Sequence, residues 1–474
     1  MVPTASASGT TWIPPIYDCS RAPELEWNTS VPHDEMMPYN FARSAKWCPD
    51  GSAVLSQCED RTFYLPDLPA KSSFADDSST QGCATHARVF RQQGPILDYV
   101  WYPSASTGNP AAFCFLASVR ECPVKLLDAS DGRLRASYRI VDHRERQVAP
   151  HSLAFNATAD RFYCGFEDAI EVFDVQRPGD GTRLHMSASK KSKDGLKGII
   201  SALAFSADAS SGVFAAGSLS SPAPSSSNIA LFSEATGEAP VMFVGAESLS
   251  HGATSGIRAS VTQLMFNPAQ PYLLYASFRR HESIYAWDLR GDVSTPVCIF
   301  DKEALESSAT TEQTRRPALT NQKIKFDIDI SGKVLGVGDQ HGNITLFDAA
   351  PGGREATSFP SESEAQVARQ LPILRYAAHD DAIGSVGFHP LRPVLLSVSG
   401  SRHFDGSPPT SSSSSESDDE ADGDAEGGYV SAGRARAVRI SRRGPQPATH
   451  DASTKLWNFD SRVEAERSTT ATAF

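Results

Sequence analysis

The same pattern of apolar and polar positions occurs seven times along the chain. Each copy holds a β-rich segment that ends on an aromatic residue, then a tight turn, then further β-rich sequence that closes on an aromatic residue or leucine, usually beside aspartate. The aromatic residues of the first halves, at spacings of 54, 54, 50, 61, 60 and 62 residues, are Trp47, Trp101, Phe155, Phe205, Phe266, Phe326 and Phe388. The second halves close at Leu65-Pro66-Asp67, Leu127-Asp128, Phe173-Asp174, Phe232-Ser233, Trp287-Asp288, Phe347-Asp348 and Trp457-Asn458. Alternating β-branched and aromatic residues between turn residues are typical of β-hairpins.

One copy illustrates the unit. Ser152–Phe155 is followed by a turn around Asp160, then by Phe162–Gly165 and by Ile170–Asp174. Helical periodicity is almost absent from the chain. A unit of this length cannot bury its own apolar face, so it must stack on copies of itself. Seven copies of a four-stranded unit close into a ring, and the sequence therefore predicts an all-β fold, a seven-bladed β-propeller.

The ends of the repeats give the domain boundaries. The expected division is a flexible N-terminal segment over 1–24, a propeller over 25–460 and a C-terminal tail over 461–474. Blade seven is interrupted, because its last strand, Thr454–Trp457, begins more than fifty residues after Val394–Val398.

The interruption covers about 401–450 and combines serines, an acidic run and an arginine cluster. Such a segment cannot bury enough apolar surface to offset its ordering entropy, so we expect a disordered insert. Two further inserts are expected at Ser218–Ser227, within blade four, and at 301–320.

The net charge of −12 arises largely from the acidic run. Glu416–Glu426 holds seven acidic residues and no basic residue, so the rest of the chain has an excess of only five negative charges. Basic loops on this mildly acidic body could still meet nucleic acid. No apolar run approaches the length of a membrane span, and the first residues lack the order of a signal peptide, so no membrane partner is expected.

The eight cysteines are scattered singly, without a Cys-x-x-Cys pair. This distribution favours buried free thiols in a reducing compartment over disulfides or zinc. We expect no metal and no cofactor. The sequence also lacks a phosphate-binding Gly-x4-Gly-Lys-Ser/Thr loop, a Gly-x-Ser-x-Gly nucleophile elbow on a strand-to-helix turn and a His-Glu-x-x-His zinc motif. We therefore expect a protein that is not an enzyme and has no catalytic residues.

Two resemblances extend this reading. Blade seven has the spacing of the WD-repeat family at His379, Ile383, Val386, Phe388 and Pro390, and Trp287-Asp288 is a literal Trp-Asp dipeptide. A WD40-type propeller is thus implied, which by itself says little about a partner.

More specific phrases, spread over roughly 25–460, resemble the telomerase Cajal body protein family. They are Ser44-Ala45-Lys46-Trp47-Cys48-Pro49-Asp50-Gly51-Ser52, Leu97-Asp98-Tyr99-Val100-Trp101-Tyr102, Ala117-Ser118-Val119-Arg120-Glu121-Cys122-Pro123, Gly132–Arg139, His151-Ser152-Leu153, Cys164-Gly165-Phe166, Gly198-Ile199-Ile200-Ser201, Trp287-Asp288-Leu289-Arg290 and Thr320-Asn321-Gln322-Lys323-Ile324-Lys325-Phe326-Asp327.

That resemblance implies a non-catalytic WD-repeat scaffold. Its expected partners are small nuclear RNAs, of the small Cajal body RNA or telomerase RNA type, and the proteins of their ribonucleoprotein particles. The expected location is the nucleus, in Cajal bodies, with the cytoplasm as an alternative. A second function stays open: a protein-interaction propeller in pre-mRNA splicing that does not contact RNA. Closure of a ring with so many nonlocal contacts also favours a chaperonin as a folding partner.

The basic loop residues gather at two of the four loop positions. In a blade with strands a to d, the a–b and c–d loops open on one face. The residues there that we interpret as RNA-binding candidates are Arg120, Arg144, Arg146, Lys190, Lys191, Lys193, Lys197, Arg279, Arg280 and Lys323. Such cations neutralise phosphates, while Arg planes and the nearby His281 and His341 can stack on unpaired bases. The alternative for each residue is a charge that only solvates its loop.

Ser415 and Ser417 precede acidic residues and are phosphorylation candidates. The acidic run is either a lid that competes with RNA for the basic face or a solvated spacer. The arginine cluster at Arg434–Arg443 is an import signal, an auxiliary RNA arm or a linker.

Overall fold

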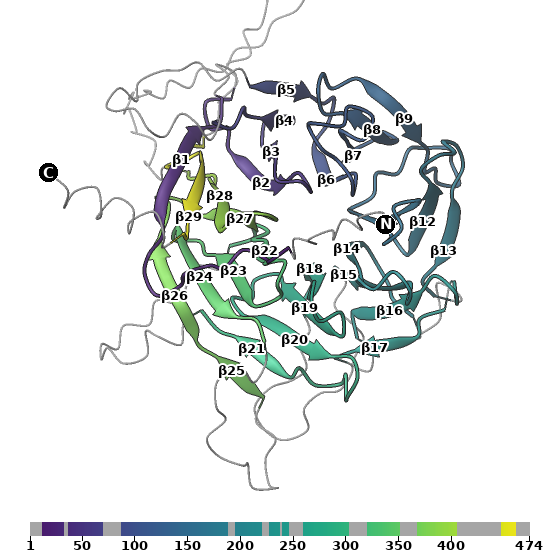
Figure 1. The fold of residues 1–474 in the computed structure, drawn as a ribbon. Helices are drawn as coiled ribbons and strands as arrows, with labels where there is room; N and C mark the ends of the chain where they lie inside the picture. Colours follow the sequence, from purple (N-terminus) through teal and green to yellow (C-terminus); the bar gives the residue numbers. More distant parts are fainter. Residues whose placement is uncertain are drawn as a thin grey trace, which may run out of the picture.

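The computed structural model describes residues 12–32, 37–69, 87–187, 195–219, 227–237, 239–245, 259–302, 320–350, 367–404 and 447–460. Within these ranges it consists of strands, turns and bends with no helix, so no described helix could cross a lipid bilayer. Seven sheets stand around a central axis and form a closed ring (Figure 1). The predicted fold is confirmed: the chain is an all-β, seven-bladed propeller.

In each blade the strands follow one another from the centre of the ring outward. Blades one to four consist of β2 (Ala42–Trp47), β3 (Val54–Cys58), β4 (Thr62–Leu65) and β5 (Arg88–Arg91); β6 (Ile96–Trp101), β7 (Cys114–Val119), β8 (Val124–Asp128) and β9 (Leu134–Tyr138); β10 (Ser152–Phe155), β11 (Arg161–Phe166), β12 (Ala169–Asp174) and β13 (Thr182–His185); and β14 (Ile200–Phe205), β15 (Val213–Ser218), β16 (Ile229–Ser233) and β17 (Met242–Val244).

Blades five to seven complete the ring. They consist of β18 (Val261–Phe266), β19 (Leu273–Phe278), β20 (Ile284–Asp288), β21 (Cys298–Phe300) and β25 (Ala368–Gln370); β22 (Phe326–Ile328), β23 (Val334–Gly338), β24 (Asn343–Asp348) and β26 (Pro372–Ala377); and β27 (Ile383–Phe388), β28 (Val394–Ser399), β29 (Ser453–Asn458) and β1 (Glu24–Ser30). All neighbouring strands are antiparallel except β21 and β25, which pair in parallel.

The ring closes by pairing the two ends of the described chain. Strand β1 lies antiparallel to β29, from Leu25 opposite Trp457 to Ser30 opposite Ser453. In Figure 1 the purple strand β1 accordingly lies beside the yellow strand β29. The strand expected as the first of each repeat is therefore the outermost strand of the preceding blade, and the strand expected second is the innermost. Closure follows from this offset between repeat and blade.

Six of the seven aromatic residues that mark the repeats end an innermost strand, but the sixth does not. Phe326 begins β22 and pairs with Val337, whereas Ile328 pairs with Leu335. Ile328 and Leu335 are the last pair before the turn between the first two strands, as Phe388 and Leu395 are in blade seven. Ile328 therefore holds the repeat position in blade six, two residues after the aromatic residue that the pattern selected.

The apolar core is divided among the contacts between blades. Seven clusters of buried side chains occur, and each is shared by two adjacent blades. Leu346, Phe388 and Trp457, for example, belong to the cluster between blades six and seven. Blade seven also has a buried hydrogen-bond network. The His379 ring contacts Ser397 Oγ at 2.7 Å and Asp451 Oδ2 at 3.0 Å, and Trp457 Nε1 donates to the Ser397 hydroxyl at 2.8 Å. These bonds satisfy buried polar groups that would otherwise destabilise the blade.

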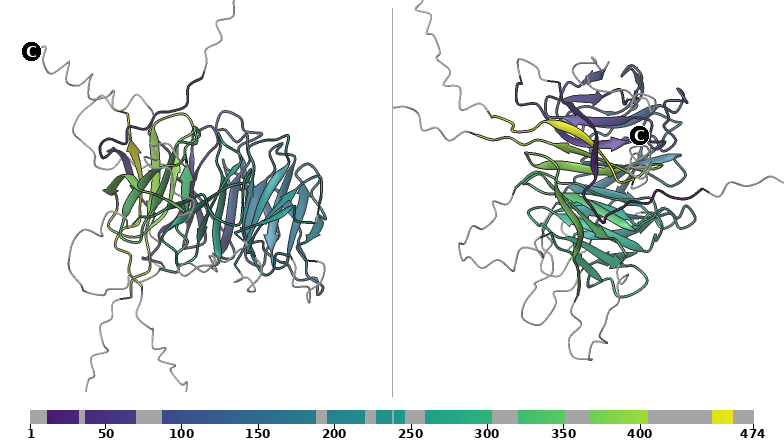
Figure 2. Two further views of the ribbon diagram at one scale, coloured as in Figure 1. Left: turned by 90° about the horizontal axis from the view of Figure 1, so that it is seen from below. Right: turned by 60° about the vertical axis from the view of Figure 1, so that its left-hand side comes forward.

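The antiparallel order places the strand connections on two faces of a disc, which Figure 2 shows from the side. We call one the crossover face. It carries the connections between consecutive blades and the hairpins between the second and third strands of each blade, such as the β3–β4 and β19–β20 turns. The opposite face carries the remaining turns. The a–b and c–d loops expected from the sequence correspond to the crossover face.

Tyr17, in the segment before β1, packs onto blade seven. Its ring lies 4.8 Å from that of Phe388, and its hydroxyl donates to the carbonyls of His389 and Arg392 at 3.2 and 3.1 Å.

The described cysteines are free thiols, and Cys19 alone among them is not fully buried. Burial raises the pKa of Cys48 to about 12. The expected inserts fall mostly outside the described residues, as do 1–11 and 461–474.

Candidate nucleic-acid interface

The crossover face carries every predicted RNA-binding residue that the structure describes. Arg120 lies in the β7–β8 hairpin and the arginine pair Arg279 and Arg280 in the β19–β20 hairpin. The connections between blades contribute Arg144 and Arg146, Lys197 and Lys323. Lys190, Lys191, Lys193, Ser415 and Ser417 lie outside the described residues.

Three of these residues lie in loops that hydrogen bonds hold in place. The Arg146 guanidinium pairs with Asp142 Oδ2 at 2.7 Å, and the backbone amide of Arg144 donates to Asp142 Oδ1 at 2.8 Å. Hydrogen bonds from Arg146 lower the pKa of Asp142 to about 2, so this turn holds a carboxylate beside its two arginines. The carbonyl of Lys197 accepts a hydrogen bond from the Ser218 hydroxyl, which fixes the backbone at that position.

The other predicted residues meet at the mouth of the central channel. Here the innermost strands of blades one and six bring two lysines to Asp98, which lies on β6 in blade two. Lys46 Nζ, on β2, is 3.7 Å from Asp98 Oδ1, and Lys325 Nζ, just before β22, is 3.8 Å from the same oxygen. Asp98 Oδ2 accepts the backbone N–H of Leu153 at 2.9 Å. One carboxylate is thus shared by two ammonium groups.

Electrostatic effects connect this centre with the loops above it. Desolvation and then the charges of Lys325, Arg279 and Arg43 lower the pKa of Lys323. Burial, Lys323 and Arg120 lower the pKa of His151, which favours its neutral form. These residues are therefore close enough to influence one another. We call Arg43, Lys46, Arg120, Arg279, Lys323 and Lys325 the channel-mouth cluster.

The channel-mouth cluster is only partly neutralised by acidic groups. Besides Asp98, Glu59 pairs with Arg43 and also with Arg402. Burial lowers the pKa of Lys46 to about 8, because the positive charge is poorly solvated inside the channel. Although burial opposes it, the two neighbouring lysines keep the pKa of Asp98 below its usual value. An added anion would relieve the mutual repulsion of these cations.

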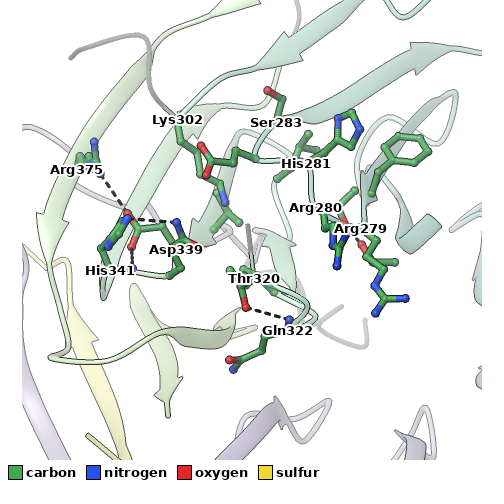
Figure 3. Close-up of a pocket in the computed structure, with 18 residues that line it drawn as sticks. Arg279, Arg280, His281, Ser283, Lys302, Thr320, Gln322, Asp339, His341 and Arg375 are labelled. Atoms are coloured by element: carbon green, nitrogen blue, oxygen red, sulfur yellow. Dashed lines mark hydrogen bonds and ion pairs between the residues drawn. The ribbon is translucent and has the colours of Figure 1, made fainter. Parts of the chain in front are cut away.

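A pocket of about 140 Å³ lies beside this cluster, between blades five and six. Its walls come from the β19–β20 hairpin, the connection 320–324, the β23–β24 hairpin and Arg375 on β26. Figure 3 shows Arg375, Asp339 and His341 on one side and Arg279, Arg280 and His281 on the other, with Thr320 and Gln322 between them.

The two sides of the pocket are held by hydrogen bonds. Arg280 Nε and an Arg279 guanidinium nitrogen donate to Asn321 Oδ1 at 2.8 and 3.3 Å. Across the pocket, Asp339 accepts the backbone amide of His341 at 2.8 Å and the Arg375 guanidinium at 3.2 Å. The first set joins the β19–β20 hairpin to the connection 320–324, and the second holds the β23–β24 hairpin to β26, so both fix the shape of the opening.

One described group could be considered for a metal ion: Asp381, His403 and His450 offer ligand atoms within 4.8 Å of one another. The two imidazole rings are stacked, with centroids 3.7 Å apart and an angle of 9° between their planes. Lone pairs of nearly parallel rings do not converge on one tetrahedral ion. Asp381 already accepts the Ser401 hydroxyl and the backbone amide of His450. The group is therefore best explained as hydrogen bonding that holds the segment after β28 to the segment before β29.

Sequence reasoning missed part of this interface. Lys46 lies in β2 and Lys325 just before β22, where a lysine is expected simply as a polar position of an alternating strand. Lys302 follows β21 and Arg375 lies in β26, both outer strands. Their role in the surface becomes evident only when the innermost strands are identified. His281 and His341, expected near RNA, do line the pocket.

Comparison with known proteins identifies relatives. No family model matches the chain. Over 391 residues, it is 27% identical to telomerase Cajal body protein 1 of Mesocricetus auratus, which covers 82% of this chain and 63% of the relative. The predicted resemblance is confirmed. The rat protein of the same name is 29% identical over 368 residues (77% of this chain, 60% of the relative), and the human protein 27% over 367 residues (77% and 58%).

The chain thus spans about three fifths of the length of these telomerase Cajal body protein 1 relatives. The phrases that carried the resemblance also contribute to the interface. Lys46, Asp98, Arg120, His151 and Lys323 each lie in one of them. Segments that resemble the telomerase Cajal body proteins therefore converge on the channel mouth.

Proposed function

We propose that this protein is a non-catalytic scaffold that binds small nuclear RNA, of the Cajal body or telomerase type, through its crossover face. The observation that carries the proposal is the channel-mouth cluster, in which Lys46 and Lys325 share Asp98 and four further cations lie close enough to influence Lys323 or His151. Cations held close together attract phosphates strongly, because binding one relieves their repulsion and releases counterions from the RNA. Arg120 and Arg279 also offer planar groups on which unpaired bases stack.

The relatives support the biological side of the proposal. Their name, telomerase Cajal body protein 1, links them to telomerase and to Cajal bodies. By analogy this chain acts in the nucleus, in Cajal bodies, and guides the assembly or localisation of ribonucleoprotein particles together with their proteins. A rigid propeller suits this role, because it presents one face to RNA and leaves its opposite face and outer strands for protein partners.

The proposal is tested by removing two cations from the channel mouth. In the variant Arg120→Ala/Lys323→Ala, both residues are exposed and lie outside the strands, one in a turn and the other in the connection before β22, so the fold should persist. RNA affinity should fall about tenfold or more at physiological salt, and the slope of log K against log salt should become shallower by about 1 to 2. Titration of fluorescently labelled total small nuclear RNA over a range of salt concentrations measures both quantities.

The matched control is Arg161→Ala/Lys333→Ala, which removes two exposed cations from the opposite face. Its RNA affinity should stay within about twofold of that of the parent protein, and its slope of log K against log salt should be unchanged. Equal weakening by both variants would show attraction by overall charge and contradict a specific face. If the parent protein does not bind RNA at all, the alternative of a protein-interaction propeller in splicing replaces the proposal.

A further inference from the structure

The pocket between blades five and six is a partly open hollow with charged, polar and apolar walls. It lies on the crossover face and is lined by the arginine pair Arg279 and Arg280 that begins the β19–β20 hairpin. Four of its lining residues carry positive charge (Arg279, Arg280, Lys302, Arg375) and two carry negative charge (Glu282, Asp339). The pocket is therefore cationic, as is the channel mouth beside it.

Lys302 is the most informative residue of the pocket. Its side chain lines the pocket although the residue is only 8% exposed, and its ammonium group donates to the carbonyl of Gly338 at 2.9 Å. Burial lowers its pKa to about 8. Asp339 and Glu282 favour its charged form electrostatically, and the hydrogen bond to Gly338 uses one of the three N–H donors of the ammonium group. The other donors are available to a ligand anion in the pocket.

The rest of the lining suits a flat, partly polar ring. Ile284, Ile324 and Val337 supply apolar surface, while Thr262 and Ser277 hold their hydroxyls 2.8 Å apart. At the rim, His281 lies in an aromatic row with Phe278 and Tyr285, with ring centroids 6.2 and 6.5 Å apart.

Polar groups that can read the edge of such a ring lie on the connection 320–324. The Gln322 side chain is positioned because its amide donates to the carbonyl of Gly400 at 2.9 Å, and its backbone N–H donates to Thr320 Oγ1 at 3.0 Å. An amide that donates through its nitrogen still has a carbonyl oxygen that can accept. Apolar walls with a few fixed polar groups are typical of small-ligand pockets.

We infer that this pocket receives a single unpaired nucleotide of the bound RNA, with its base between the apolar walls and its phosphate near Lys302 and the arginine pair. The inference rests on the proposed function and sharpens it, because a base stacked within a duplex cannot enter a pocket between two blades. The RNA is thus recognised where a loop or an end presents a free base. The channel-mouth cluster then holds the neighbouring phosphates.

The test uses the full chain and the four 5′-nucleoside monophosphates as probes, with inorganic phosphate and the free nucleosides for comparison. Isothermal titration calorimetry should detect at least one monophosphate at millimolar affinity, at least threefold tighter than inorganic phosphate and than its own nucleoside. Lys302→Met, which keeps an unbranched, flexible side chain of similar size but removes the charge, should weaken this binding about tenfold. Lys333→Met on the opposite face is the matched control and should not.

A second variant guards against loss of structure at the buried Lys302. His281→Ala lies on the exposed rim, and it should weaken the preferred monophosphate about threefold while leaving inorganic phosphate unchanged. The inference is overturned if no monophosphate saturates the protein, or if both pocket variants bind like the parent. These results would leave the proposed function intact as long as Arg120→Ala/Lys323→Ala still weakens RNA binding. Absence of RNA binding by the parent protein would instead remove the proposed function itself.

Discussion

Asp98 and Asp327 both lie on innermost strands, but their surroundings shift their pKa values in opposite directions. Lys46 and Lys325 keep Asp98 ionised in spite of its burial. Burial raises the pKa of Asp327 to about 7, and nearby Asp329 adds to the effect. One carboxylate is thus part of the charged surface, while the other titrates near neutral pH inside the ring, where it accepts the backbone N–H of Phe388 at 2.8 Å.

Asp327→Asn should therefore stabilise the protein, and it should do so only at higher pH. Because the pKa is raised in the folded state, the unfolded chain loses this proton first as the pH rises from about 4 to about 7, and the folded state becomes relatively less stable across that window. The variant cannot ionise, so at pH 8 it should exceed the parent by about 2–4 kcal/mol in free energy of unfolding, with little difference at pH 4.5.

Thermal or chemical unfolding at the two pH values provides the measurement. Asp131→Asn, on an exposed turn, serves as the control; its free energy of unfolding should differ from that of the parent by the same small amount at both pH values. A stabilisation by Asp327→Asn that does not depend on pH would refute the account of this residue.

At the scale of elements, alternation and turn residues predicted the hairpins, because strands that bury one or both faces need that pattern. The aromatic markers were less precise in blade six. Phe326 and Ile328 face the same side of β22, and only the turn held by Asp329 shows that the strand ends at the second of them. Likewise, the strand Glu24–Ser30 is recognisable as β-rich, but its partner lies at the other end of the chain, where local sequence gives no signal.

Strand β1 should be needed for a stable ring. Removing residues 1–31 would uncover the outer edge of β29 and the cluster that includes Val31, leaving an unpaired edge that can join other chains. We expect the melting temperature to fall by about 5 °C or more, with aggregation on heating, relative to the full chain.

Two shorter truncations separate the contributions. Removing 1–11 should have no effect, and removing 1–22 should report the loss of the Tyr17 contacts with blade seven alone. Differential scanning calorimetry with light scattering measures all three. If the 1–31 truncation melts like the 1–22 truncation, then pairing of β1 with β29 does not stabilise the ring.

At the scale of the whole molecule, seven rigid blades bring residues from distant repeats to one opening. The sequence was sufficient to assign Arg120, Arg279 and Lys323 to one face, because loop position follows from the repeat. It could not indicate that Lys46 and Lys325 share Asp98, since that contact joins three blades across the channel. The pocket was equally hidden, because its lining residues come from separate connections of two blades.

The central claim is that RNA contacts this protein directly, on the crossover face. The most direct test is ultraviolet crosslinking in cells, followed by mass spectrometry of the peptides that carry RNA and sequencing of the RNA itself. The account predicts crosslinked peptides that contain Arg120, Arg279–His281 or Lys323, attached to a small set of small nuclear RNAs. Crosslinks confined to turns of the opposite face, or protein partners without any crosslinked RNA, would contradict it.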